Sequence, residues 1–199
     1  QAKRLYETTR KDFYLKALCP AGVTLRFRTD SETLGLSITA AKGSSRTFFA
    51  LDVEVDGKYL GSVKNFGEDA SPTVYSHNPA PLGDFSGHFD LGKGEKNVCV
   101  YLPWSVRLTL REMTLDDGAW LLPLPYKKKA LMFGDSITQG YDARYPSRRY
   151  ASQLCKWLDA EEHSRAIGGE KFCPGLAACR EPFTPDLITV ASDELEAAV

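Results

Sequence analysis

Short segments of alternating apolar and polar residues run through the first 122 residues of the chain. Residues 23–28 alternate in this way, and residues 33–39 place Leu34, Leu36 and Ile38 on one face. A period of two is typical of strands that are buried on one side only. The same pattern predicts further strands at residues 48–55, 58–63, 97–102 and 105–113, with a hairpin turn at Asp56-Gly57. Because glycine and proline separate these segments, residues 1–122 are expected to form an antiparallel β-sandwich of jelly-roll type.

The pattern changes after residue 122. The sequence Leu-Pro-Leu-Pro at 122–125 indicates a stiff, extended connection, and residues 123–126 are interpreted as a linker. Residues 129–133 are a continuous apolar run, residues 148–158 carry apolar side chains at helical spacing, and residues 187–191 are a second apolar run. Strand, helix and strand in this order predict an α/β domain at residues 127–199. The expected fold class is therefore two-domain, β followed by α/β.

The amino-acid composition is that of a globular protein and excludes several classes of function. A chain that is 43% hydrophobic with a net charge of −1 forms a real core and gives no support for a nucleic-acid partner. The basic run from Arg144 to Arg149 is short and is expected to be solvated. Five cysteines, an odd number without Cys-x-x-Cys spacing, indicate reduced, buried thiols and no metal site. No apolar run has the length of a membrane span. We expect a cytoplasmic protein without cofactors, or a secreted one if a leader preceded Gln1.

Candidate chemistry centres on Ser136, which follows the apolar run 129–133 in the sequence Gly134-Asp135-Ser136. A serine that leaves the end of a buried parallel strand lies at the sheet edge where α/β proteins bind ligands, and this placement suits a nucleophile. The alternative role is a helix N-cap, which serine fills well at a strand-to-helix junction. Asp135 is expected to brace the turn by accepting backbone hydrogen bonds. The flanking residues do not form the Gly-x-Ser-x-Gly elbow of α/β-hydrolases.

Residues 134–138, Gly-Asp-Ser-Ile-Thr, resemble the first block of the SGNH (GDSL-type) hydrolases, a family of esterases and acyl-hydrolases. Residues 166–170 resemble the second block, and residues 185–191 resemble the strand that leads into the third. The resemblance implies the first half of a flavodoxin-like α/β/α domain. It implies that Ser136 is the catalytic nucleophile and that the N–H groups of Ser136 and Gly169 hold the oxyanion. It also implies that the two turns are supported by Gly134, Asp135 and Gly168.

The sequence departs from the family pattern in its last part. Ser164 stands where family members usually carry Asn, and Ser192-Asp193-Glu194 replaces Gly-x-Asn-Asp. The Asp-x-x-His block that supplies the family's catalytic base does not occur in the 199 residues. We interpret the chain as truncated at its C-terminus relative to the family, with an unpaired strand edge that predicts a homo-oligomer through residues 186–199. The histidines that could replace the base are His77 and His88, expected in sandwich loops, and His163, expected just before the second strand.

A small β-sandwich in front of an SGNH domain resembles the arrangement in some carbohydrate esterases. The expected substrate is therefore a small acyl ester, such as a short acyl group on a carbohydrate, and the expected reaction is ester hydrolysis through Ser136. Two alternatives stay open. One is a non-catalytic module in which the sandwich binds sugar through aromatic side chains such as Tyr75, Tyr101 or Trp104. The other is an inactive, truncated product.

Overall fold

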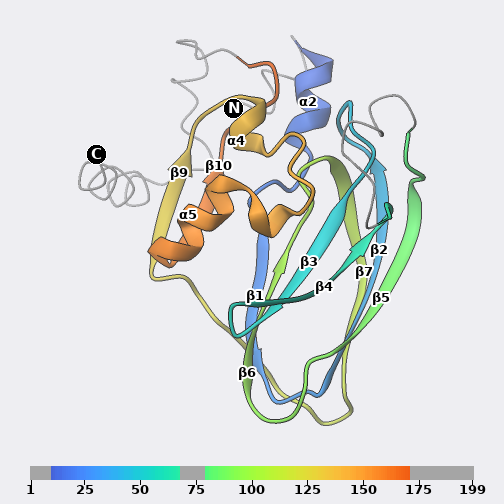
Figure 1. Cartoon of the computed structure of the whole chain (residues 1–199), viewed down its shortest axis with the longest axis vertical. Helices are drawn as coiled ribbons and strands as arrows, with labels where there is room; N and C mark the ends of the chain where they lie inside the picture. The colour runs from blue at the N-terminus through green and yellow to red at the C-terminus, as the bar shows by residue number, and fades with distance from the viewer. Residues whose placement is uncertain (1–9, 68–78, 171–199) are drawn as a thin grey trace.

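The structure, a computed structural model, describes residues 10–67 and 79–170. Most of these residues lie in antiparallel sheets, with few helices (Figure 1). One sheet has five strands in the order β4-β3-β6-β1-β8, and another has three in the order β5-β2-β7. The strands of the first are β1 (Thr24–Thr29), β3 (Ala50–Val55), β4 (Lys58–Lys64), β6 (Lys96–Tyr101) and β8 (Leu121–Pro123), and those of the second are β2 (Thr33–Lys42), β5 (Gly83–Asp90) and β7 (Val106–Leu115).

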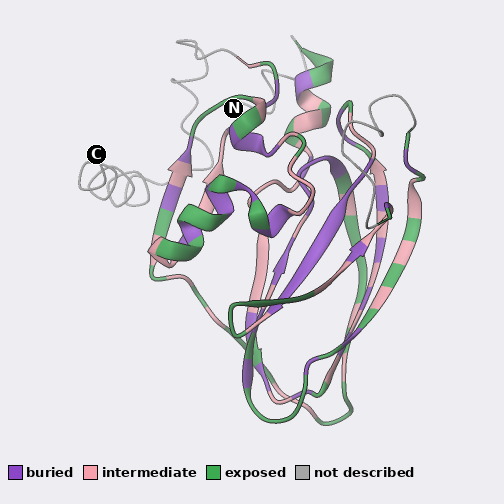
Figure 2. Cartoon of the chain, viewed as in Figure 1, coloured by how far each residue is buried: buried purple, intermediate pink, exposed green. Residues whose placement is uncertain are grey.

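The two antiparallel sheets share one hydrophobic core. The inward-facing residues Leu34 and Ile38 of β2 are fully buried, and so are Leu51 and Val53 of β3. Figure 2 shows β3 buried along nearly its whole length, in agreement with its place inside the five-stranded sheet. Each fully buried aliphatic side chain contributes about 1.5–3 kcal/mol relative to its exposed state. The alternation of the sequence therefore identified most of the strands that supply this core, although not β5, which adds Phe89.

The predicted hairpin between β3 and β4 is confirmed, because these strands pair antiparallel on either side of Asp56 and Gly57. Both turn residues have positive φ, 48° and 76°, as a two-residue turn of this handedness requires. Asp56 Oδ1 also accepts the backbone N–H of Asn97 at 2.9 Å, which ties the turn to β6.

The chain after β8 forms a separate parallel pair. Strand β9 (Lys128–Met132) pairs in parallel with β10 (Ala160–Ser164), and helix α5 (Tyr150–Leu158) connects them after a short 3-10 helix, η1 (Pro146–Arg148). Ala151 and Cys155 of α5 pack on the two strands. The predicted strand at residues 129–133 and helix at residues 148–158 are present as β9 and α5, and the strand that pairs with β9 is β10. The helical stripe is only partly buried, because Trp157 is 81% exposed.

Two strands and one helix were not expected. Strand β5 was not expected because its sequence contains two glycines and polar residues, and β8 lies at the start of the segment interpreted as a linker. Pro123 of β8 is paired with Phe27 at the edge of the sheet, where a residue without an N–H donor is tolerated. Helix α2 (Lys11–Ala17) precedes β1 and buries Phe13 against Ile167. The expected strand at residues 187–191 and the oligomer segment 186–199 lie outside the described residues.

Candidate functional site

Ser136 lies at the start of a short helix directly after β9. Helix α4 (Ser136–Gln139) is capped by Asp135, whose Oδ1 accepts the N–H of Ile137 at 2.9 Å. The cap is therefore Asp135 and not Ser136, so the alternative role of the serine as N-cap is wrong. The Ser136 hydroxyl is half-buried and makes no hydrogen bond within residues 10–67 and 79–170. Its oxygen is therefore not used by the fold that surrounds it.

Glycine at position 134 is required by a close contact with Thr138. A Cβ atom at Gly134 would lie 2.1 Å from Thr138 Oγ1, so any larger residue would displace the threonine. Thr138 Oγ1 in turn lies 2.7 Å from the hydroxyl of Tyr150, the first residue of α5. The spacing Gly-Asp-Ser-x-Thr thus has a local physical reason. The threonine folds back over the glycine and connects the turn to the helix.

A second turn lies beside the first at the carboxyl edge of the parallel pair. After β10 the Arg165 N–H donates to Met132 O at 2.8 Å, and the Ile167 N–H donates to Gly134 O at 3.3 Å. The segments that follow β9 and β10 therefore lie side by side. Gly168 and Gly169 follow at once, so the structure brings the two predicted turns together.

Gln139 joins these two turns. Its side chain is 1% exposed, and its Oε1 accepts the N–H of Gly168 at 2.7 Å. A Cβ atom at Gly168 would lie 2.7 Å from the ring of Tyr141, which explains the absence of a side chain there. Gly169 has a φ of +86°, in the region that favours glycine. The sequence analysis did not identify Gln139. The one feature of the sequence that could have indicated its role is the position of this amide side chain, directly after the Gly-Asp-Ser-x-Thr block.

Two backbone donors remain open at this edge. Gly168 has its N–H bound to Gln139, and Lys16 of α2 donates to the Gly168 carbonyl at 2.6 Å. Among the described residues, neither the N–H of Ser136 nor that of Gly169 donates a hydrogen bond. Both N–H groups lie in the two turns that adjoin at the ends of β9 and β10.

A buried ion pair between Arg149 and Glu162 contacts the end of the first turn. Arg149 and Glu162 are 1% and 4% exposed and form two bonds, Nη2 to Oε1 at 2.8 Å and Nη1 to Oε2 at 3.2 Å. Arg149 Nη2 also donates to the carbonyl of Thr138 at 2.8 Å, which links the end of α4 to β10. The expectation that the basic run 144–149 is solvated is therefore wrong for Arg149. The sequence shows a charge cluster but does not show that a strand residue 13 positions later neutralises one of its members.

Solved structures with the same fold support this description. A salicylyl acyltransferase, SsfX3, from a tetracycline biosynthetic pathway superimposes with a TM-score of 0.65 at 24% identity, over 85% of this chain and 46% of its own. A GDSL-like lipase candidate from Bacteroides ovatus gives 0.64 at 18% identity, over 84% and 50%. A family two carbohydrate esterase from Clostridium thermocellum gives 0.54 at 14% identity, over 75% and 46%.

The chain has an SGNH-hydrolase-like fold. It spans about half the length of the solved structures that it matches. No family model matches the sequence, and no curated protein is significantly similar to it. The SGNH-like fold was predicted from residues 134–138 and 166–170, and these residues form the two adjoining turns.

The two histidines in the described ranges, His88 and His163, form no hydrogen bond with Ser136. His163 lies within β10, not before it, and its Nε2 is 3.4 Å from Glu161 Oε2. His88 is exposed on strand β5, where a loop was expected. His77 lies outside the described residues. Within the described ranges no hydrogen bond joins a histidine to Ser136, so the position of a general base is open there.

Two of the three aromatic residues suggested for sugar binding are buried. Tyr101 is 7% exposed and donates to Glu54 Oε2 at 3.3 Å. Trp104 is 2% exposed, packs edge-on against Phe48 and donates from Nε1 to the Ala143 carbonyl at 2.9 Å. Neither ring is exposed on the surface of the sandwich. Tyr75 lies outside the described residues.

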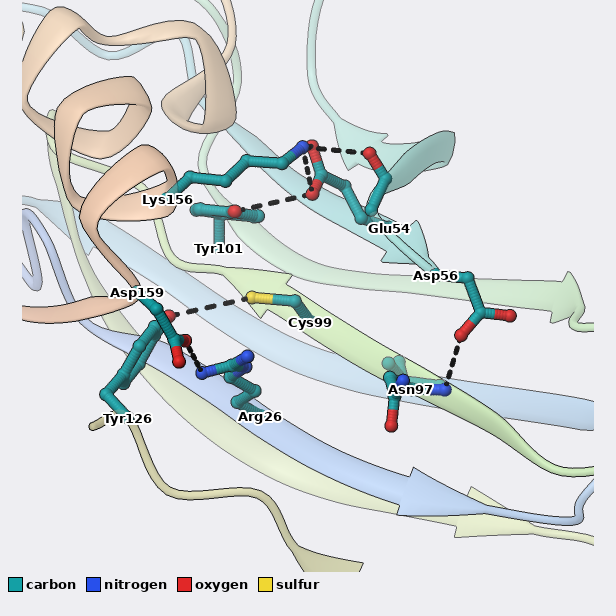
Figure 3. Close-up of a pocket in the computed structure, with 11 residues that line it drawn as sticks. Arg26, Glu54, Asp56, Asn97, Cys99, Tyr101, Tyr126, Lys156 and Asp159 are labelled. Atoms are coloured by element: carbon teal, nitrogen blue, oxygen red, sulfur yellow. Dashed lines mark hydrogen bonds and ion pairs between the residues drawn. The ribbon is translucent and has the colours of Figure 1, made fainter.

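A polar cavity of about 160 Å³ lies where the end of α5 meets the five-stranded sheet (Figure 3). Its charged groups bind one another. Lys156 Nζ donates to both carboxylate oxygens of Glu54, at 3.0 and 2.9 Å, and Arg26 Nη1 donates to Asp159 Oδ1 at 2.8 Å. Figure 3 shows Cys99 between these pairs, where burial raises the pKa of its thiol. We interpret the cavity as part of the contact between α5 and the sheet.

The described residues contain no reactive thiol and no metal site. The thiols of Cys19 and Cys155 are buried, and burial raises the pKa of each to about 12, so both stay protonated and unreactive at neutral pH. No group of three or more His, Cys, Asp or Glu side chains in residues 10–67 and 79–170 is arranged to hold a metal ion. None of the helices in those ranges has the length and hydrophobicity needed to cross a membrane.

Proposed function

We propose that Ser136 is the nucleophile of an ester hydrolase or acyl-transfer site and that the N–H groups of Ser136 and Gly169 hold the oxyanion. One observation carries this proposal. The two turns lie together at the carboxyl edge of β9 and β10, and both N–H groups are unpaired among the described residues while the neighbouring Gly168 N–H is bound by Gln139. The similar solved structures include an acyltransferase and a carbohydrate esterase, which supports the same class of chemistry.

The proposed reaction has two steps. Ser136 Oγ attacks the ester carbonyl, its proton passes to a base, and the alcohol leaves from the tetrahedral intermediate. Water then hydrolyses the acyl-enzyme and regenerates the serine. Oxyanion donors of this kind contribute roughly 10²–10³ in rate. Because the Ser136 hydroxyl makes no hydrogen bond to a base among the described residues, the proposed reaction takes its base from outside them, such as His77 or a residue of a partner chain.

The substrate is proposed to be a small acyl ester, including short acyl groups on carbohydrate. In this proposal residues 1–122 are a jelly-roll sandwich domain, residues 123–126 a linker and residues 127–199 the first half of an SGNH domain. The protein is also proposed to form a homo-oligomer whose contact includes residues 186–199. Size-exclusion chromatography with light scattering tests the last point, and a stable monomer would contradict it.

Hydrolysis of p-nitrophenyl acetate by the purified chain tests the assignment of Ser136. Turnover is expected to disappear in Ser136→Ala and to persist in Ser45→Ala, which changes an exposed loop serine. Labelling by a fluorophosphonate provides a second readout, because it reports an activated serine without turnover. Equal rates and equal labelling in all three proteins would show that the turn has the scaffold of a nucleophile without its reactivity.

A further inference from the structure

The outer face of the three-stranded sheet has a hollow that lies apart from Ser136. Its volume is about 360 Å³, and neighbouring positions of β5, β2 and β7 line it. Figure 1 shows this sheet on the opposite side of the molecule from β9 and α5. The residues paired across the hollow form two rows, Ser86–Ser37–Glu112 and His88–Gly35–Thr114.

Gly35 forms the floor of this hollow. It lies in the central strand, and its φ is not in the left-handed range, so its backbone conformation does not require glycine. A Cβ atom there would lie 2.3 Å from Thr114 Oγ1 and 3.9 Å from His88 Nδ1. The Thr114 hydroxyl therefore occupies the space that a side chain at position 35 would fill, and the His88 imidazole lies next to it. A glycine within a strand weakens it and often marks the close approach of a ligand.

The polar side chains over the hollow do not bind one another. The neighbouring row of the same face is different, because Thr39 Oγ1 donates to Asp84 Oδ1 at 2.5 Å and accepts from Arg111 Nε at 2.8 Å. In the hollow, side chains that make no hydrogen bond or ion pair within the described ranges are Ser37, Ser86, His88, Glu112 and Thr114. The face therefore has one self-paired row beside two rows whose polar groups are open to a ligand.

The chemistry of these groups selects a class of ligand. Hydroxyls donate and accept, a carboxylate accepts, and an imidazole does either according to its tautomer. The residues that line the hollow include no Lys or Arg that would bind an anion and no Phe, Tyr or Trp. Glu112 would also repel an anionic ligand. We propose that this hollow binds a neutral oligosaccharide, whose hydroxyl groups match these donors and acceptors, at a site separate from Ser136.

Titration of the full ¹⁵N-labelled chain with neutral hexasaccharides of β-1,4-linked glucose, xylose or mannose tests the proposal. At least one is expected to give saturable amide shifts that map to the middle of β2, β5 and β7. Ser37→Val, which removes a hydroxyl, and Glu112→Gln, which removes the charge that strengthens an accepted hydrogen bond, should each weaken this binding about tenfold. Thr109→Val, on the same face beyond the hollow, should leave the affinity unchanged. Circular dichroism identifies any variant that fails to fold.

The result separates this site from the proposed esterase site. Binding should be the same in Ser136→Ala, whether or not the chain hydrolyses esters. No saturable shift up to about 10 mM of any of the three sugars would overturn the proposal, since binding weaker than this is outside specific recognition. Shifts that map to other elements, or equal affinity in Ser37→Val, Glu112→Gln and Thr109→Val, would overturn it as well.

Discussion

The buried carboxylate of Asp52 makes a testable contribution to the pH dependence of stability. Asp52 lies in β3 and is fully buried, and its Oδ2 accepts the N–H and the hydroxyl of Ser147 at 2.9 and 2.6 Å. Its Oδ1 is buried without a hydrogen-bond partner among the described residues. Burial raises the pKa of Asp52 to about 6, and Glu54 adds to the rise, while the bonds from Ser147 and the charge of Arg148 oppose it. The ionised form is therefore the unfavourable one in the folded protein.

The magnitude follows from the difference between the folded and unfolded pKa values. An unfolded aspartate titrates near 3.9, so a folded pKa of about 6 corresponds to about 3 kcal/mol. Because the pKa is raised, this stabilisation is fully present below about pH 4 and is lost as the pH rises through about 6. Asp52→Asn keeps an acceptor for Ser147 and carries no charge at any pH. Its free energy of unfolding, measured relative to the original protein, should therefore be about 3 kcal/mol larger at pH 8 than at pH 4.

Urea denaturation followed by circular dichroism at pH 4, 5, 6, 7 and 8 measures this difference. The cost of burying the new amide group is common to every pH and drops out of the comparison. Asp117→Asn, which changes an exposed carboxylate, is the control and should follow the original protein. A difference between Asp52→Asn and the original protein that does not change with pH would refute the reasoning. So would a change of opposite sign.

Three further results are expected. Arg149→Met should lower the free energy of unfolding by about 3–5 kcal/mol because it leaves the Glu162 charge buried and unpaired, and adding Glu162→Leu should restore much of this in urea denaturation. No recovery in the double variant would contradict that cause. Gln139→Ala should lose about 1–3 kcal/mol and increase the hydrogen exchange of the Gly168 amide, whereas unchanged exchange would exclude the bond. Cys19 should react with iodoacetamide at pH 8 only after unfolding in urea, and rapid labelling of the native chain would show that its thiol is accessible.

Periodicity predicted most of the strands that supply the core, because strands such as β2 bury every second residue. It did not predict β5, because Gly83 and Gly87 occupy two of the inward positions and weaken its apolar alternation. The turn at Ser136 was predicted by its local sequence, since both the cap and the contact between Gly134 and Thr138 lie within five residues. Gln139 and Arg149 were not predicted. Their partners lie 29 and 13 residues away, and only the folded chain shows that an amide and a guanidinium are buried there.

The hydrogen bond from Trp104 to the Ala143 carbonyl makes the indole a natural optical probe of the chain that follows α4. Trp104 is buried, whereas Trp157 is 81% exposed and emits as an indole in water. In Trp157→Phe the emission would come from Trp104 and the half-buried Trp120. A red shift in that protein on adding an ester analogue would report that the segment beside Ser136 moves when the site is filled. Trp104 is thus an intrinsic fluorophore in contact with the segment that follows the Ser136 turn.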